Sequence, residues 1–187
     1  MTKLNKRTLW LTQLALLTAI TVVLQMIPLQ FGPFRLALVL VPIVIGGALL
    51  GIGAGAWLGA VFGVVVLLSP DAAPFLAFSV PGTLLTILVR GIGAGAAGGL
   101  VFRLLEKKND YAAVLASAFT VPVVNTGMFV LGSVMFFLPL FEQWAEGGDA
   151  VSFLFFTMIG LNFFIELGST MLLSGVILRI IRIWKKA

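Results

Sequence analysis

The sequence contains no histidine and no cysteine. Their absence excludes thiol and imidazole nucleophiles, disulfides, haem ligation and most zinc sites, and with them a Ser–His–Asp catalytic triad. The chain also has only 7 acidic residues, too few in pairs to suggest a metal site made of carboxylates. We therefore expect a protein that is not an enzyme and that holds no metal and no cofactor.

Charged residues are scarce as well. They make up 10% of the chain, against 60% hydrophobic residues and a mean hydropathy of +1.16. A soluble domain has about a quarter of its residues charged. Uncharged apolar stretches of more than about 18 residues recur from end to end, and each is a candidate transmembrane helix. The strict alternation typical of a membrane β-barrel is missing, so the composition predicts an all-α integral membrane protein.

The formal charge of +5 could indicate binding to nucleic acid, but the positions of the basic residues indicate otherwise. All of the 12 Lys and Arg residues except Arg35 and Arg90 lie at the two termini or in one connection near residues 103–108. The positive-inside rule describes this distribution for cytoplasmic segments of membrane proteins. We therefore expect membrane lipid around the chain and no nucleic-acid partner.

The apolar stretches divide into six predicted spans. Residues 36–69 form a run of 34 uncharged residues, and a single helix of that length would measure about 50 Å, against a hydrocarbon core of about 30 Å. A break near Gly46–Gly51 would give two short helices. With an even number of spans, both basic termini lie in the cytoplasm. The predicted spans of this compact six-helix bundle, a single membrane domain of residues 1–187, are 9–28, 36–50, 52–69, 78–105, 111–140 and 151–180.

Two similar glycine-rich phrases start forty residues apart, "GIGAGAWLGAVF" at Gly51 and "GIGAGAAGGLVF" at Gly91. A phosphate-binding glycine loop needs a strand–loop–helix context and usually a Lys-Ser/Thr pair, and neither is present. Glycines at intervals of four instead allow membrane helices to approach closely. We expect two glycine stripes to pack antiparallel spans together, and no ATP hydrolysis by this chain alone. The stripes are Gly51, Gly55, Gly59 and Gly63, and Gly91, Gly95 and Gly99.

Two charged residues interrupt the apolar spans, Arg90 in the fourth and Glu166 in the sixth. An ionisable side chain at mid-bilayer costs about 3 kcal/mol by insertion scales, and such residues usually face the bundle interior on a substrate path. The helical rise places Asn125, Thr126 and Asn162 at a similar depth, with Glu166 one turn further in than Asn162. A guanidinium suits a carboxylate or phosphate, whereas carboxamides suit hydroxyls and amides. These five side chains form our predicted pocket for a small polar molecule.

The residues alone leave three alternatives open. Arg90 and Glu166 could form a structural ion pair between the fourth and sixth spans, with or without a pocket beside it. Glu166 could instead carry protons in a self-sufficient secondary transporter, although no clear inverted repeat is visible. A membrane scaffold would keep the ion pair and bind no ligand.

Five segments together resemble a known family. They are "ALLTA" in the first span, "VPIVIGGALLG…GAWLGAVFG" across the second and third, "LVRGIGAG" in the fourth, "VVNTGMF" in the fifth and "GLNFFIE" in the sixth. Over nearly the whole chain, their order and spacing resemble the substrate-binding S components of energy-coupling factor (ECF) transporters. The closest likeness is to the pantothenate-type branch. One departure lies at the inner turn, where relatives often have Gly-Pro and this chain has Gly51-Ile52.

The resemblance implies a multi-pass protein of the bacterial plasma membrane that captures a vitamin outside the cell. It also implies docking on one transmembrane coupling subunit and two ATPase subunits, followed by release of the vitamin inside. In the family, an Ala-x-x-x-Ala face on the first span contacts the coupling subunit, and Ala15 and Ala19 match it here. Without the resemblance, the same alanines could equally pack inside the bundle.

The identity of the vitamin rests on the predicted pocket. Arg90 at mid-membrane indicates an anionic ligand. Pantothenate carries a carboxylate, an amide and hydroxyl groups that Arg90, Asn125 and Asn162 could bind. The single tyrosine, Tyr111, is expected near the inner face, so an aromatic sandwich for a flavin is not evident. Cobalamin, riboflavin and pyridoxine remain open alternatives.

Overall fold

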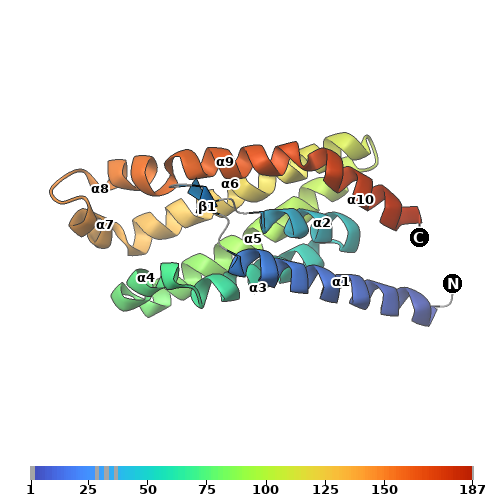
Figure 1. The fold of residues 1–187 in the computed structure, drawn as a ribbon, viewed down its shortest axis with the longest axis horizontal. Coiled ribbons are helices and arrows are strands. Elements are labelled where there is room, and N and C mark those ends of the chain that lie inside the picture. Colours follow the sequence, from blue (N-terminus) through green and yellow to red (C-terminus); the bar gives the residue numbers. More distant parts are fainter. Residues whose placement is uncertain (1–2, 28–29, 32–33, 36–37, 187) are drawn as a thin grey trace.

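The computed structural model describes residues 3–27, 30–31, 34–35 and 38–186. Their long helices lie side by side along the long axis of the molecule (Figure 1). Two antiparallel strands of two residues each, β1 and β2, are the only strands in these segments. The elements are α1 (Lys3–Met26), β1 (Gln30–Phe31), β2 (Phe34–Arg35), α2 (Leu40–Leu50), α3 (Ile52–Leu67), η1 (Pro70–Ala72), α4 (Ala73–Phe78), α5 (Val80–Leu105), α6 (Asp110–Phe136), α7 (Leu138–Trp144), α8 (Ala150–Ser152), η2 (Phe153–Ile159), α9 (Gly160–Leu172) and α10 (Ser174–Lys186).

Four helical stretches of the described chain are long and apolar enough to cross a membrane, namely Lys6–Met26, Val80–Leu105, Asp110–Phe136 and Ala150–Leu172. A fifth candidate is α3 together with residues 70–78, which bend away from it by 76°. α2 is apolar but has only 11 residues, so it is about 16 Å long against a hydrocarbon core of about 30 Å. The expected all-α, multi-pass membrane protein is confirmed, whereas the count of six spans stays a prediction.

The bounds of the helices differ from the predicted spans at several points. The fifth span, predicted over 111–140, is divided after Phe136, because Pro139 lies in the first turn of the separate helix α7. The sixth, predicted over 151–180, begins in α8, continues as the π-helix η2 and is divided at Leu173, where α9 gives way to α10. Residues 28, 36 and 37 of the first two predicted spans lie outside the described residues.

The break predicted near Gly46–Gly51 lies at Gly51, between α2 and α3. Gly51 has a φ of 98°, a backbone conformation that residues with a side chain rarely adopt. Ile52 begins α3 directly after it. The departure from Gly-Pro therefore keeps the turn, because the glycine supplies the positive φ and the following residue needs only a helical conformation.

α3 and α5 pack through their glycines, backbone against backbone. A Cβ atom at Gly55 would collide with the carbonyl oxygen of Gly95, and one at Gly59 would collide with that of Gly91. This close contact confirms the predicted packing of the two stripes. Gly51 is the exception. Its spacing fits the first stripe, but a Cβ atom at Gly51 would have no neighbour within 4 Å, so this glycine serves the turn instead of the packing.

Two clusters of buried apolar residues fill the bundle. The larger joins α1, α2, α3, α5, α6 and α10, and it includes Leu58, Phe62 and Phe102. The smaller is mainly aromatic, with Phe137 and Phe141 at its centre, and it connects α6, α7, α8 and η2. The candidate site described below lies where α5 and α6 pass between the two clusters.

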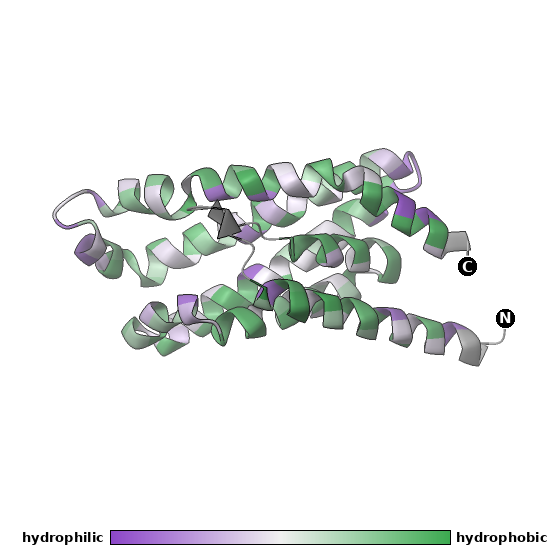
Figure 2. Ribbon diagram, viewed as in Figure 1, coloured by the Kyte–Doolittle hydropathy of each residue, from purple (hydrophilic) through white to green (hydrophobic). Residues whose placement is uncertain are grey.

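The two ends of the bundle differ in charge. α1 begins, α5 connects to α6, and α10 ends at the same end of the molecule (Figure 1). Figure 2 shows hydrophilic residues gathered there, at the start of α1, in the α5–α6 connection and along α10. The opposite end, formed by α7 and the connection to α8, carries Glu142, Glu146 and Asp149. The bundle therefore has a basic end and an acidic end, separated by an apolar middle.

Candidate ligand-binding site

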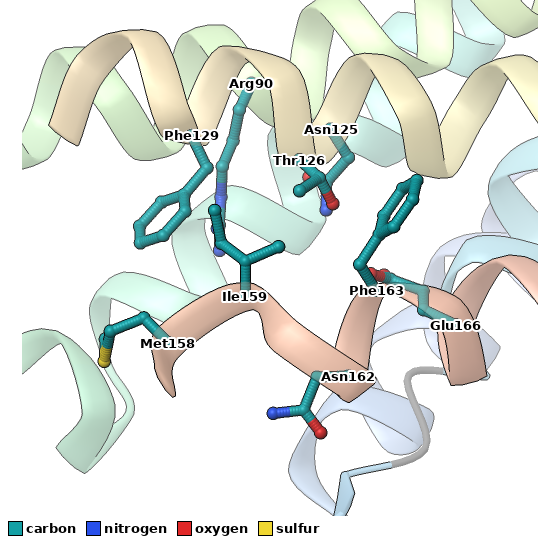
Figure 3. Close-up of a pocket in the computed structure, with 9 residues that line it drawn as sticks. All are labelled: Arg90, Asn125, Thr126, Phe129, Met158, Ile159, Asn162, Phe163 and Glu166. Carbon is teal, nitrogen blue, oxygen red and sulfur yellow. The ribbon is translucent and has the colours of Figure 1, made fainter. Parts of the chain in front are cut away.

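A cavity of about 210 Å³ lies among α5, α6, η2 and α9 (Figure 3). Its lining combines charged, carboxamide and apolar side chains. The lining residues are Arg90, Asn125, Thr126, Phe129, Met158, Ile159, Asn162, Phe163 and Glu166. This volume is below the range of about 300–1,000 Å³ usual for pockets of drug-sized ligands, so the cavity fits a small molecule.

All five side chains predicted to form a pocket line this one cavity. Arg90 comes from the middle of α5, Asn125 and Thr126 from α6, and Asn162 and Glu166 from α9. The consecutive helices α5 and α6 and the later helix α9 thus bring them together, as their matching depths predict. Binding of a ligand to these residues stays a prediction.

The Arg90 side chain enters the cavity beside two aromatic rings. Its guanidinium carbon lies 5.1 Å from the ring centroid of Phe129 and 5.7 Å from that of Phe62. Both distances fall within the range of a cation–π attraction, about 6 Å. The Arg90 Nε is buried and has no hydrogen-bond partner. A cation is thus held next to the cavity with at least one N–H donor unused.

Glu166 lies apart from Arg90 within the same cavity. Figure 3 shows the two side chains apart, with Asn125 and Thr126 between them and Phe163 beside Glu166. Their charges attract each other through space, but within the part of the chain that the structure describes no ion pair joins the two groups. This arrangement therefore differs from the structural Arg90–Glu166 ion pair that the sequence left open as an alternative.

The two asparagines differ in their surroundings. Asn125 is 5% exposed, and its Oδ1 is buried without a hydrogen-bond partner. Buried polar atoms in folded proteins almost always have a partner, so such an acceptor calls for a water or a ligand. Asn162 also lines the cavity, but its carboxamide extends from α9 away from Asn125 in Figure 3 and has an interaction of its own.

Four apolar lining residues and Phe62 were not among the predicted site residues. Phe129 follows Asn125 by four positions in "VVNTGMF" and so shares its helix face; this spacing could have identified it. Met158 and Ile159 lie in the π-helix η2, which sequence periodicity does not predict. η2 is followed by Gly160 with a φ of 25°, and π-helical turns often occur at functional sites.

The cavity has an apolar groove next to it. This groove, of about 600 Å³, lies between α6 and the segment of η2 and α9. Thr126, Ile159 and Phe163 line both the cavity and this groove. These three side chains therefore lie between the polar cavity and the apolar groove.

Ala15 and Ala19 lie on the exposed face of α1. The other side of α1 packs on α3, where the indole N–H of Trp57 donates to the Thr18 hydroxyl at 3.2 Å, and Leu17 is buried. Packing of the two alanines inside the bundle, the alternative left open by the sequence, is thus not found. Their face is free to meet another helix.

Among the described residues, no three His, Cys, Asp or Glu side chains lie close enough to hold a metal ion. The polar groups of the cavity are one cation, one carboxyl, one hydroxyl and two carboxamides. They suit an organic ligand with both an acidic group and hydrogen-bonding groups.

The chain was compared with known proteins. A protein-family model described as "ECF transporter, substrate-specific component" matches residues 10–181, nearly the whole chain. A comparison with curated proteins and one with solved structures gave no match.

Proposed function

Since this chain belongs to the family of substrate-specific components of ECF transporters, we propose that it is the pantothenate-binding component of such a transporter. Components of this family bind small-molecule substrates and work with a transmembrane coupling subunit and ATPases, and the family is not a class of enzymes. The specific steps proposed are capture of pantothenate outside the cell, docking on one coupling subunit and two ATPase subunits, and release inside.

One observation carries the choice of ligand: Arg90 and Asn125 line the same small cavity, and each has a buried polar atom, Nε and Oδ1, that no hydrogen bond satisfies. Pantothenate carries a carboxylate for the guanidinium. Its amide and hydroxyl groups can donate hydrogen bonds to the Asn125 carbonyl oxygen and to the Glu166 carboxyl group. In this arrangement the carboxylate lies at the Arg90 end of the cavity and the hydroxyl end lies toward Glu166.

The size of the cavity supports the same choice among the vitamins. The cavity volume of about 210 Å³ is already below the range for drug-sized ligands. It therefore disfavours cobalamin, which is larger than such ligands. Riboflavin and pyridoxine lack a carboxylate to neutralise Arg90. Tyr111, the single tyrosine, lies in the first turn of α6, remote from the cavity residues of that helix. Among these vitamins, pantothenate is therefore the candidate that fits both the positive charge of Arg90 and the volume of the cavity.

The proposed topology has six membrane segments with both termini in the cytoplasm of a bacterial cell. α2 and α3 are then two short segments joined at the cytoplasmic turn of Gly51. The basic end of the bundle supports this orientation through the positive-inside rule. The acidic end, with α7 and the loop that follows, then faces outward, and pantothenate enters from that side.

The proposed docking contact is the exposed face of α1 with Ala15 and Ala19. Small side chains let the backbones of two membrane helices approach closely without hydrophobic driving force. Leu substitutions at both positions would hold the coupling subunit away while leaving the cavity, which α1 does not line, unchanged.

Uptake of labelled pantothenate tests the proposal. Cells that carry the coupling module should take up the vitamin only when this chain is present and ATP is available. Uptake by liposomes that contain this chain alone and a proton gradient would instead support the self-sufficient secondary transporter and contradict the proposed function. The Ala15→Leu/Ala19→Leu variant should lose uptake but keep binding of pantothenate in detergent.

A further inference from the structure

The guanidinium of Arg90 is accompanied by two rings from two different helices. Phe129 belongs to α6 and lines the cavity, whereas Phe62 belongs to α3, is 5% exposed and does not line the cavity. Their ring centroids lie 5.1 Å and 5.7 Å from the Arg90 guanidinium carbon. α5, which carries Arg90, packs closely against both α3 and α6. Phe62 and Phe129 are called the aromatic clamp below.

A cation in the apolar middle of a membrane protein needs compensation, and the usual compensation is a carboxylate or a backbone carbonyl. Either partner would occupy N–H groups of the guanidinium. An aromatic face attracts a cation through its quadrupole without accepting a conventional hydrogen bond. The clamp therefore compensates the charge of Arg90 and leaves its hydrogen-bond donors unoccupied.

The remaining contacts of Arg90 agree with this role. Its Nε has no hydrogen-bond partner, and within the described residues Glu166, the acidic residue that shares the cavity, forms no ion pair with it. The position of Phe129 is itself fixed, because its ring meets the edge of Phe75 at a centroid distance of 6.3 Å. Phe75 in turn packs at 5.1 Å on Phe137 of the aromatic cluster.

We propose that the aromatic clamp of Phe62 and Phe129 positions Arg90 and thereby makes the site selective for a ligand with an anionic group. The inference rests on the proposed function, since it takes an anionic vitamin as the ligand. Phe62 and Phe129 are positioning residues: they act through Arg90. Removing either ring loosens the guanidinium, so an anionic ligand loses more affinity than a neutral ligand of the same shape.

The test compares two probes by isothermal titration calorimetry on the purified full chain in detergent. The probes are pantothenate and pantothenol, the alcohol in which a hydroxymethyl group replaces the carboxylate. In Phe62→Leu and in Phe129→Leu, binding of pantothenate should weaken about 5- to 30-fold, the effect of a desolvated cation–π contact. Binding of pantothenol should change by less than about twofold, since it has no charge for Arg90 to bind.

Two controls separate positioning from shape. Phe129→Tyr keeps the ring and should keep the preference for pantothenate. Phe119→Leu removes an exposed ring of the same helix that lines neither the cavity nor the groove and should change nothing. Phe62→Leu and Phe129→Leu act from different helices, so each reports on the clamp even where the other fails to fold.

The outcomes are distinct for the two proposals. Equal losses for pantothenate and pantothenol, or no loss for either, would overturn the aromatic clamp while the proposed function stands. A wild-type chain that binds neither probe would overturn the proposed function and, with it, the anionic ligand that the clamp serves.

Discussion

Arg90 and Gly91 are neighbours in α5, yet their surroundings are opposite. Gly91 touches the backbone of Gly59 so closely that even a methyl group would collide with a carbonyl oxygen. Arg90 extends a long side chain beside a cavity of about 210 Å³. The first contact fixes the rotation and the depth of α5 against α3. The second uses that fixed position to direct a charged group at a ligand, so the tight packing of one face sets the geometry of the open one.

Substitutions on the two sides of α5 should therefore have different effects: on the Arg90 side they should change ligand affinity, and on the glycine side they should change stability. The largest effect should come from Arg90→Ala, which should weaken pantothenate binding by about 2–5 kcal/mol because it removes a buried charged partner of the ligand. Titration calorimetry measures the loss, and the exposed Arg103 of the same helix offers Arg103→Ala as a matched control. Thermal unfolding should stay near that of the wild type. Unchanged affinity would remove Arg90 from the site.

On the glycine face the effect should appear in stability. Gly59→Ala forces a Cβ atom into the backbone of Gly91, which should destabilise the folded chain by about 1–3 kcal/mol. Gly53→Ala in the same helix meets nothing within 4 Å and should be neutral or stabilising by up to about 1 kcal/mol, since Ala favours a helix over Gly. Thermal unfolding in detergent distinguishes them. Similar melting of both variants would contradict the close packing of α3 and α5.

Glu166→Gln removes the carboxyl charge from the cavity. The amide keeps the size and hydrogen-bonding ability of the side chain, and among the described side chains Glu166 has no ion pair that the change would break. Pantothenate affinity should therefore fall less than about tenfold. Uptake that depends on the coupling module should persist. Complete loss of uptake with intact binding would instead indicate that Glu166 carries a proton during transport.

The smallest effect concerns the acidic end of the bundle. The Asp149 carboxylate accepts a hydrogen bond from the Ser152 N–H at 2.7 Å, and this contact, aided by the Ser152 side chain, holds the pKa of Asp149 below its usual value. Since the folded pKa lies below the unfolded one, the cap stabilises fully above about pH 4 and is lost as the pH falls through the folded pKa.

Asp149→Asn keeps a capping oxygen that does not titrate. Between pH 7 and pH 3, its melting temperature should therefore fall slightly less than that of the wild type. Parallel curves would show that the Asp149 cap contributes nothing that depends on pH.

Much of this architecture could be predicted from the sequence because each feature follows from a local pattern. The spacing of the glycines in α3 and α5 predicts their contact, and an uncharged run too long for one helix predicts the break at Gly51. Arg90, Asn125 and Glu166 could be placed in one pocket because the rise of a helix converts position into depth.

Other features depend on packing that a single sequence does not encode. The pairing of Phe62 with Arg90 requires the rotation of α3 against α5. The division of the last span at Leu173 and the π-helix before Gly160 contradict the regular period that a continuous helix of residues 151–180 would have. The direction of the Asn162 carboxamide likewise follows from this distorted segment, which is why its depth alone does not place it beside Asn125.

In the proposed function, the guanidinium of Arg90, sheltered in the middle of the bundle, receives the acidic group of a captured vitamin. An experimental structure of the chain with pantothenate tests it most directly. We predict the ligand carboxylate within hydrogen-bond distance, about 3 Å, of the Arg90 guanidinium, with the hydroxyl end toward Glu166. Pantothenate bound elsewhere, or a guanidinium turned toward lipid with no ligand beside it, would contradict the account.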